Sequence, residues 1–264
     1  MPSLPSSLPD DWLAPVPDPA RVAWLRGRDF AHRGLHGDGA PENSGSAFDR
    51  AMLGGYGIEL DVQRTFDGQP VVFHDFALER LTDHAGPIAG RTASELGAIT
   101  LRGSADTICT LREVLVRVDG LVPVLIEVKL RRESNAPGFC LAVRRALEGY
   151  AGAHAVMSFD PRVSRWFRRH SPETVRGLVL SRKEDSGALG RGRHRLAMWY
   201  AQPDFLAMDL RELPGRFATG QRRRGMPVAT WTVRDLAGYE RALTCTDARI
   251  FEGMIPPAAD ARAA

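Results

Sequence analysis

Cysteine is scarce in this sequence, and long hydrophobic runs are absent. Cys109, Cys140 and Cys245 form neither a metal-binding spacing nor an even disulfide set. This argues against a disulfide-stapled secreted scaffold and a structural zinc site, and it fits a reducing compartment. Residues 1–19 are rich in Pro and Ser but lack the basic and apolar regions of a signal peptide. We therefore expect a cytoplasmic protein without a transmembrane segment.

Charge of one sign is also limited. The formal net charge is only +3 at pH 7, and no basic stripe with interleaved aromatics indicates a nucleic-acid partner. The second half nevertheless gathers arginines at positions 165, 168, 169, 191, 193, 195, 222, 223 and 224. They form either a solvated surface or a face that attracts an anionic substrate or a peripheral membrane contact. Nothing in the sequence bears on the oligomeric state.

Eight segments with strand character alternate with helical segments. The strands are expected at 28–34, 58–62, 123–129, 154–159, 175–180, 205–209, 228–232 and 249–252. This alternation in a chain of 264 residues predicts a TIM-type (β/α)8 barrel. We expect the barrel to occupy residues 28–256, with a Pro-rich lead-in and short capping helix over 1–27 and a disordered tail over 257–264.

One further strand-like run, residues 71–75, follows 58–62 too closely for a parallel crossover, which needs a dozen or more residues. Asp67-Gly68 between the two runs is a strong hairpin-turn signal. We therefore predict an antiparallel hairpin that extends above the barrel mouth after the second strand, followed by a small insertion over 77–108. The fold-back brings His74 nearly opposite Asp61.

Polar side chains gather at the predicted carboxyl ends of the strands, where barrel chemistry sits. They are His32, Arg33, Glu59, Asp61, Glu127, Lys129, Ser158 and Trp231. Glu59 and Asp61 share one strand face because side chains alternate with a period of two. With Glu127 they form a set of hard oxygen ligands that suits one divalent cation, Mg²⁺ or Ca²⁺.

An anionic substrate that bridges this metal, Arg33 and Lys129 is the natural interpretation, and a phosphodiester fits it best. His32 and His74 would flank the site as general base and general acid. Simpler interpretations exist for single residues: Lys129 as a salt-bridge partner of Glu127, Trp231 as barrel core, and the acidic pair as a solvated face.

Short motifs recur in a specific order along most of the chain. They are Ala31-His32-Arg33-Gly34, Pro41-Glu42-Asn43-Ser44, Glu59-Leu60-Asp61-Val62, Thr65-x-Asp67-Gly68, Val71-Val72-Phe73-His74-Asp75, Leu78-x-Arg80-Leu81-Thr82, Thr110-Leu111-x-Glu113-Val114-Leu115, Ile126-Glu127-Val128-Lys129, Ser158-Phe159 and Trp231-Thr232-Val233. In these motifs the sequence resembles the glycerophosphodiester phosphodiesterase family, within the barrels similar to phosphatidylinositol-specific phospholipase C.

The resemblance implies metal-dependent hydrolysis of small glycerophosphodiesters to glycerol 3-phosphate and an alcohol. The residues that it assigns are His32 and His74 as the acid/base pair, Glu59, Asp61 and Glu127 as metal ligands, Arg33 and Lys129 on the phosphate, Glu42 as an ordering loop carboxylate, and Phe159 and Trp231 against the alcohol.

The chain departs from this family at its last strand. The family usually closes with Asp-Gly-Ile-Ile-Thr-Asp, whereas this chain has Arg249-Ile250-Phe251-Glu252-Gly253. The strand is retained but its Asp is not, which bears on substrate range more than on catalysis. Two alternatives remain open: lysophospholipase D or phospholipase C-like activity on lipid, which a long apolar groove beside Phe159 and Trp231 would favour, and a non-catalytic barrel that binds a phosphorylated ligand.

Overall fold

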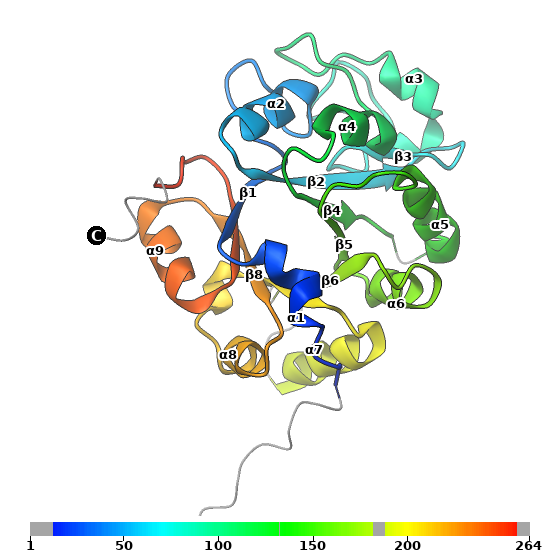
Figure 1. The fold of residues 1–264 in the computed structure, drawn as a ribbon. Coiled ribbons are helices and arrows are strands. Elements are labelled where there is room, and N and C mark those ends of the chain that lie inside the picture. Colours follow the sequence, from blue (N-terminus) through cyan, green and yellow to red (C-terminus); the bar gives the residue numbers. More distant parts are fainter. Residues whose placement is uncertain (1–12, 132, 182–187, 258–264) are drawn as a thin grey trace, which may run out of the picture.

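In the computed structural model, which describes residues 13–131, 133–181 and 188–257, parallel strands close into a barrel (Figure 1). These strands are β1 (Arg28–His32), β2 (Gly57–Arg64), β4 (Val124–Val128), β5 (His154–Ser158), β6 (Val175–Leu180), β7 (Phe205–Asp209), β8 (Val228–Val233) and β9 (Ala248–Phe251). The barrel closes because β1 pairs in parallel with both β2 and β9, with Ala31 facing Ile58 on one side and Phe251 on the other. The predicted TIM-type barrel is confirmed.

Helices follow the strands and form an outer ring. They are α2 (Gly45–Leu53), α4 (Leu111–Val118), α5 (Ala136–Ala146), α6 (Pro161–His170), α7 (Ala188–Ala201), the 3₁₀ turn η4 (Leu210–Glu212), α8 (Arg216–Arg223) and α9 (Leu236–Cys245). Among the described residues, each helix is too short or too polar to cross a membrane.

The helix starts follow local capping chemistry. The Ser44 hydroxyl accepts a hydrogen bond from the Ala47 N–H at the start of α2, and Gly54 ends that helix. Thr110 and Glu113 form a reciprocal capping box at the start of α4. Both caps are local, since a side chain can satisfy the free N–H groups of a first turn using neighbours within three or four residues.

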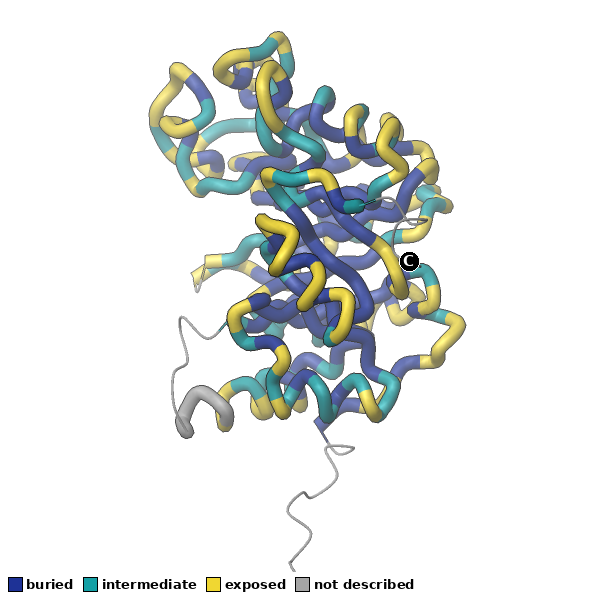
Figure 2. The backbone as a smooth tube through the Cα atoms, turned by 90° about the vertical axis from the view of Figure 1, so that its left-hand side faces the viewer, coloured by how far each residue is buried: buried dark blue, intermediate teal, exposed yellow. Residues whose placement is uncertain are grey.

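The barrel interior is filled by side chains, and Figure 2 shows the strands as the buried centre of the molecule. Two glycines allow the largest of these side chains to fit. A Cβ at Gly57 would lie 2.4 Å from the Phe30 ring, and one at Gly177 would lie 2.4 Å from the Phe205 ring. The aromatic rings therefore occupy the volume that the missing side chains leave, as close packing of a core requires.

A short helical segment covers one end of the barrel. It comprises α1 (Pro19–Val22) and the 3₁₀ turn η2 (Ala23–Leu25). Val22 and Leu25 are buried and pack with Phe30 and Phe205 of the interior, and Figure 1 shows α1 lying across the barrel. Residues 1–12 of the predicted lead-in and residues 258–264 of the predicted tail over 257–264 lie outside the described residues.

The predicted hairpin is present. β3 (Pro70–Val72) pairs antiparallel with β2, with Val62 facing Val72. The insertion that follows contains the 3₁₀ turn η3 (Ile88–Gly90) and α3 (Ala93–Gly97). It has a small core of its own, formed by Val71, Phe73, Leu78, Ile88, Leu96, Ile99, Leu101 and Ile108. This core anchors the hairpin, so the residue after Phe73 has a defined position beside the barrel mouth.

Candidate active site

A cavity of about 520 Å³ opens at the carboxyl ends of the barrel strands. The predicted site residues that line it are His32, Arg33, Glu59, Asp61, His74, Glu127, Lys129, Phe159 and Trp231. Glu42 is not among the lining residues. The structure thus brings together side chains from β1, β2, β4, β8, the hairpin and the loop after β5, as expected for residues at strand ends of one barrel.

Three buried carboxylates form the floor of this cavity. Glu59 and Asp61 lie on β2, and Glu127 lies directly beside Asp61 on the neighbouring parallel strand β4. One oxygen from each residue lies within 4.8 Å of the others. The cluster follows from two local facts: side chains of period two share a strand face, and parallel pairing in this register places β4 next to β2.

Burial and neighbouring charges shift the pKa values of the three carboxylates. Burial, together with the neighbouring Asp61 carboxylate, raises the pKa of Glu59 to about 8. Burial also raises the pKa of Glu127. Burial acts in the same direction on Asp61, but the charges of Lys129, His74 and Arg33 lower its pKa instead. Crowded buried carboxylates with hard oxygen donors are the ligand set that Mg²⁺ and Ca²⁺ prefer, so these residues fit a divalent cation.

Two cations border the carboxylates. The Lys129 ammonium lies 2.9 Å from Glu127 Oε1 and 3.1 Å from Asp61 Oδ1. The Arg33 guanidinium lies 3.3 Å from Asp61 Oδ2, and its backbone N–H donates to Glu59 Oε2 at 3.1 Å. Lys129 is therefore more than the partner of Glu127, because it joins the acids of two strands.

Arg33 and Asn43 both adopt the left-handed backbone region, with φ of 57° and 58°. This backbone conformation is uncommon for residues other than glycine, and at Asn43 it accompanies two hydrogen bonds to Asp61. The Asn43 amide donates to Asp61 Oδ2 at 3.0 Å and accepts from the Asp61 N–H at 3.2 Å. Sequence reasoning considered Asn43 only as a possible helix cap, and the structure shows instead that it orients a buried carboxylate.

The two histidines each meet a carboxylate through Nδ1. His32 Nδ1 lies 2.8 Å from Glu252 Oε2, and His74 Nδ1 lies 2.6 Å from Asp75 Oδ1. Burial would lower the pKa of His32, but the hydrogen bond to Glu252 and the charge of Glu59 raise it. Burial dominates at His74 and lowers its pKa. In both rings Nε2 is the nitrogen that these carboxylates leave unengaged, and His32 Nε2 lies 3.9 Å from Glu59 Oε2.

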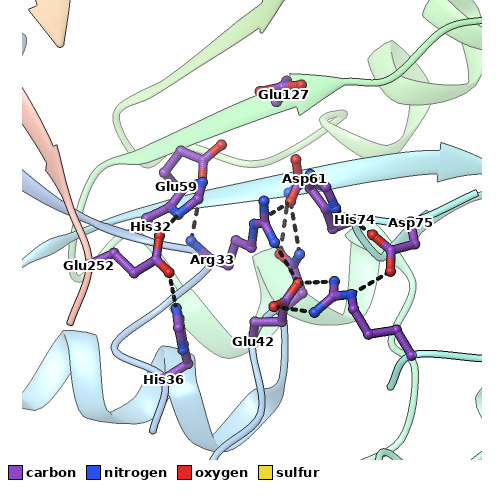
Figure 3. A network of polar contacts seen from close by, with 12 residues as sticks. His32, Arg33, His36, Glu42, Glu59, Asp61, His74, Asp75, Glu127 and Glu252 are labelled. Atoms are coloured by element: carbon purple, nitrogen blue, oxygen red, sulfur yellow. Dashed lines mark hydrogen bonds and ion pairs between the residues drawn. The ribbon is translucent and has the colours of Figure 1, made fainter. Parts of the chain in front are cut away.

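Glu252 is the site residue that sequence reasoning missed. It follows β9, in the stretch where the family pattern was seen to break, and Figure 3 shows it between His32 and His36. The hydrogen bond from His32 lowers the pKa of Glu252 to about 2. Its signal was its position at the carboxyl end of the last strand, which is the same criterion that singled out the other polar residues.

Glu42 belongs to a network behind the cavity. Its carboxylate accepts from Arg33 at 2.7 Å and from Arg80 at 2.7 and 2.8 Å (Figure 3). Arg80 also donates to Asp75 at 2.5 Å. The chain of contacts runs from Arg33 through Glu42, Arg80 and Asp75 to His74. The Glu42 carboxylate therefore links the position of the Arg33 guanidinium to that of the His74 imidazole.

Phe159 and Trp231 form the apolar part of the mouth. Their rings pack edge to face with centroids 5.5 Å apart, and the Trp231 Nε1–H donates to the Ala207 carbonyl at 3.2 Å. Trp231 is partly buried and lines the cavity, so it contributes both to packing and to the site surface.

The chain matches a family model described as the glycerophosphoryl diester phosphodiesterase family over residues 32–251. Glycerophosphodiester phosphodiesterase 1 of Bos taurus is 29% identical over 210 residues, covering 74% of this chain and 62% of that protein. A glycerophosphodiester phosphodiesterase of Bacillus altitudinis is 37% identical over 133 residues, covering 46% of this chain and 52% of that protein. The chain thus covers less than two thirds of either relative.

Solved structures share the fold. A phosphodiesterase of Oleispira antarctica, solved in complex with the product sn-glycerol-3-phosphate, superposes with a TM-score of 0.75 at 23% identity, covering 86% of this chain and 93% of that one. A glycerophosphodiester phosphodiesterase of Thermotoga maritima gives a TM-score of 0.67 at 24% identity, covering 84% and 93%.

Proposed function

The chain belongs to the glycerophosphoryl diester phosphodiesterase family, and from that premise we propose that it hydrolyses glycerophosphodiesters to glycerol 3-phosphate and an alcohol. One observation carries the proposal. A single cavity presents three buried carboxylates, two cations and two histidines that are each held by a carboxylate. These are the parts that phosphodiester cleavage needs: charge stabilisation and two positioned proton carriers.

Glu59, Asp61 and Glu127 would hold one divalent cation, Mg²⁺ or Ca²⁺. When bound there, the ion supplies Lewis-acid stabilisation of charge on the phosphoryl oxygens. The proposal is supported by the burial of all three carboxylates and by the closeness of their oxygens, one from each residue lying within 4.8 Å of the others.

Arg33 and Lys129 would hold the phosphate. Both border the carboxylate cluster and line the cavity, and their side chains are only 16% and 14% exposed. A guanidinium and an ammonium at a dry cavity wall bind phosphate oxygens through charge-assisted hydrogen bonds. Glu42 positions Arg33 from behind, and Phe159 with Trp231 offers an apolar surface to the alcohol part of the substrate.

The proton transfers fall to the histidines, with the two roles exchanged relative to the order expected from the sequence. His74, whose pKa is lowered, would accept the proton of the nucleophile, which is either water or a neighbouring hydroxyl of the substrate. As the new P–O bond forms, the bond to the alcohol oxygen breaks. His32, kept protonated by Glu252, would donate its Nε2 proton to that oxygen. Opposite pKa shifts in a pair of groups are the usual basis for such a division of roles.

Two substitutions test the acid/base assignment. We expect His32→Ala and His74→Ala to lose at least about 10²-fold in kcat for glycerol 3-phosphate release from glycerophosphoethanolamine, since positioned proton transfer contributes that much or more. His84→Ala, which removes an exposed histidine outside the cavity, serves as the control. Full activity in both site variants would overturn the assignment.

A lipid substrate is the second candidate. A smaller cavity of about 220 Å³ adjoins the first and shares Lys129 with it. Its walls include Phe66, Phe76 and Leu130, and the side chains of Phe66 and Phe76 are 73% and 37% exposed. Exposed aromatic residues beside a site suit an acyl chain or a membrane surface. Lysophospholipase D activity would make lysophosphatidylethanolamine a better substrate than glycerophosphoethanolamine, as measured by kcat/KM.

A further inference from the structure

A second set of cations lines the catalytic cavity opposite the carboxylates. Arg211 at the end of η4, Arg234 between β8 and α9, and Arg241 on α9 all line it, and we refer to them as the arginine wall. Strands β7 and β8, which lead into these segments, stand across the barrel from β2 and β4 in the strand order. The substrate phosphate and the arginine wall therefore lie on different sides of one cavity.

The wall retains unused hydrogen-bonding capacity. Arg211 pairs with Asp209, and Arg234 donates one N–H to Glu252 Oε2 at 3.0 Å. Arg241 has no carboxylate partner and no side-chain hydrogen bond among residues 13–131, 133–181 and 188–257. Each guanidinium carries five N–H donors, so most donors of the wall remain available to a ligand.

The acidic residues near the wall are already engaged. Asp209 accepts from the Arg211 backbone and guanidinium, and Asp235 accepts from the Gly238 N–H at the start of α9. Glu252 accepts from both His32 and Arg234 on the same oxygen. Arg241 is thus the cation whose charge no neighbouring carboxylate takes up.

The shared Glu252 oxygen also locates the wall relative to the chemistry. His32 Nδ1 lies 2.8 Å from that oxygen and Arg234 Nη2 lies 3.0 Å from it. The arginine wall is therefore one side chain away from the imidazole that faces the departing alcohol. An alcohol that leaves from His32 would carry its own substituents toward the wall.

We propose that the arginine wall binds a second anionic group, a carboxylate or a phosphate, on the alcohol part of a glycerophosphodiester. The proposal rests on the proposed function. Guanidinium groups bind carboxylate and phosphate in a planar, bidentate manner. The charge of Arg241, which no carboxylate among the described residues pairs with, opposes a purely cationic alcohol, because like charges repel. The protein would therefore favour acidic headgroups over ethanolamine or choline.

A matched pair of substrates tests this preference. Glycerophosphoserine and glycerophosphoethanolamine differ by one carboxylate. With Mg²⁺ or Ca²⁺ present, we expect kcat/KM to be about tenfold higher for the serine compound, the effect of one charge-assisted contact. Arg241→Gln should lower this ratio at least threefold, whereas Arg223→Gln, on an exposed arginine of α8 outside the cavity, should leave it unchanged. Arg211→Gln provides a second variant of the wall.

Three outcomes are distinguishable. Turnover with a ratio near one, or a ratio that Arg241→Gln and Arg211→Gln do not change, overturns the arginine wall and leaves the phosphodiesterase proposal intact. Absence of turnover on every glycerophosphodiester overturns the proposed function instead. In that case, calorimetry measures the affinities of the His74→Ala protein for glycerophosphoserine and glycerophosphoethanolamine. Equal affinities would refute binding of the acidic group by the arginine wall. The same kcat/KM comparison with lysophosphatidylserine and lysophosphatidylethanolamine shows whether the substrate with the acidic headgroup also carries an acyl chain.

Discussion

Replacing Glu252 by Gln is expected to slow turnover about 10²-fold while leaving the fold intact. Glu252 touches no metal-ligand candidate, but it accepts the hydrogen bond of His32 Nδ1 at 2.8 Å. The change keeps the size of the side chain and removes its charge. Glutamine can also turn its NH₂ group toward Nδ1, which would favour the tautomer that carries no proton on that atom. Glu252 is thus a positioning residue that acts through His32.

The magnitude follows from the strength of this contact. A hydrogen bond to a charged group contributes about 1.5–3 kcal/mol, and one pKa unit corresponds to about 1.4 kcal/mol. The Glu252 side chain is 26% exposed, so solvent screens part of its effect on the pKa of His32. Loss of a well-placed proton donor costs about 10²-fold or more in rate.

The assay is glycerol 3-phosphate release as a function of pH. Because Glu252 raises the pKa of His32, its removal lowers that pKa, and the alkaline limb of the kcat profile should shift to lower pH. Glu252→Asp should recover part of the rate. Glu240→Gln, on an exposed residue of α9, is the control. A kcat within twofold of the unchanged protein, with the alkaline limb in place, would refute the reasoning.

Three further results are expected. EDTA should stop turnover and Mg²⁺ or Ca²⁺ should restore it together with an increase in Tm, because a ligand of the folded state stabilises it; activity that resists EDTA would remove the metal from the mechanism. Asp75→Asn should destabilise the protein at pH 7 by less than about 1 kcal/mol, because solvent partly screens the Asp75–Arg80 ion pair. The hydrogen bonds from Arg80 and His74 outweigh the effect of partial burial and lower the pKa of Asp75 to about 2. That difference between the two proteins should shrink in urea melts as pH falls from about 4 toward 2, since a carboxylate with a depressed pKa loses its contribution there; a constant difference would contradict it. Gly177→Ala should cost about 1–3 kcal/mol in the free energy of unfolding, because its Cβ would lie 2.4 Å from the Phe205 ring, and Phe205→Leu in the same chain should recover part of it; an unchanged Tm in the single variant would argue against this packing.

The barrel and its acidic cluster could be predicted because their signals are local. Strand alternation, the Asp67-Gly68 turn and the caps at Ser44 and Thr110 each depend on residues within a few positions. The hairpin was deduced from the Asp67-Gly68 turn and from the gap before residue 71, which is too short for a crossover. Asp61 faces Phe73 rather than His74, so the predicted pairing was one residue away from the observed one.

The partners of the catalytic side chains could not be predicted in the same way. His32 and Glu252 are 220 positions apart, and they meet only because β1 pairs with β9 when the barrel closes. Glu42 was expected in the site, but the structure places it behind Arg33, where it joins Arg80 and leads to Asp75. Loop paths decide such contacts, and they follow from packing between distant segments.

The sequence by itself determined the class of this protein: a parallel barrel whose strand ends carry three carboxylates, two histidines and the two cations Arg33 and Lys129. The period-two alternation of strands and the length of crossovers impose that arrangement locally. Only the tertiary structure showed that Glu252 holds His32, and that Arg211, Arg234 and Arg241, none of them among the arginines singled out in the sequence, line the cavity. The contact between His32 and Glu252 depends on closure of the barrel, because closure brings the ends of the chain's first and last strands together.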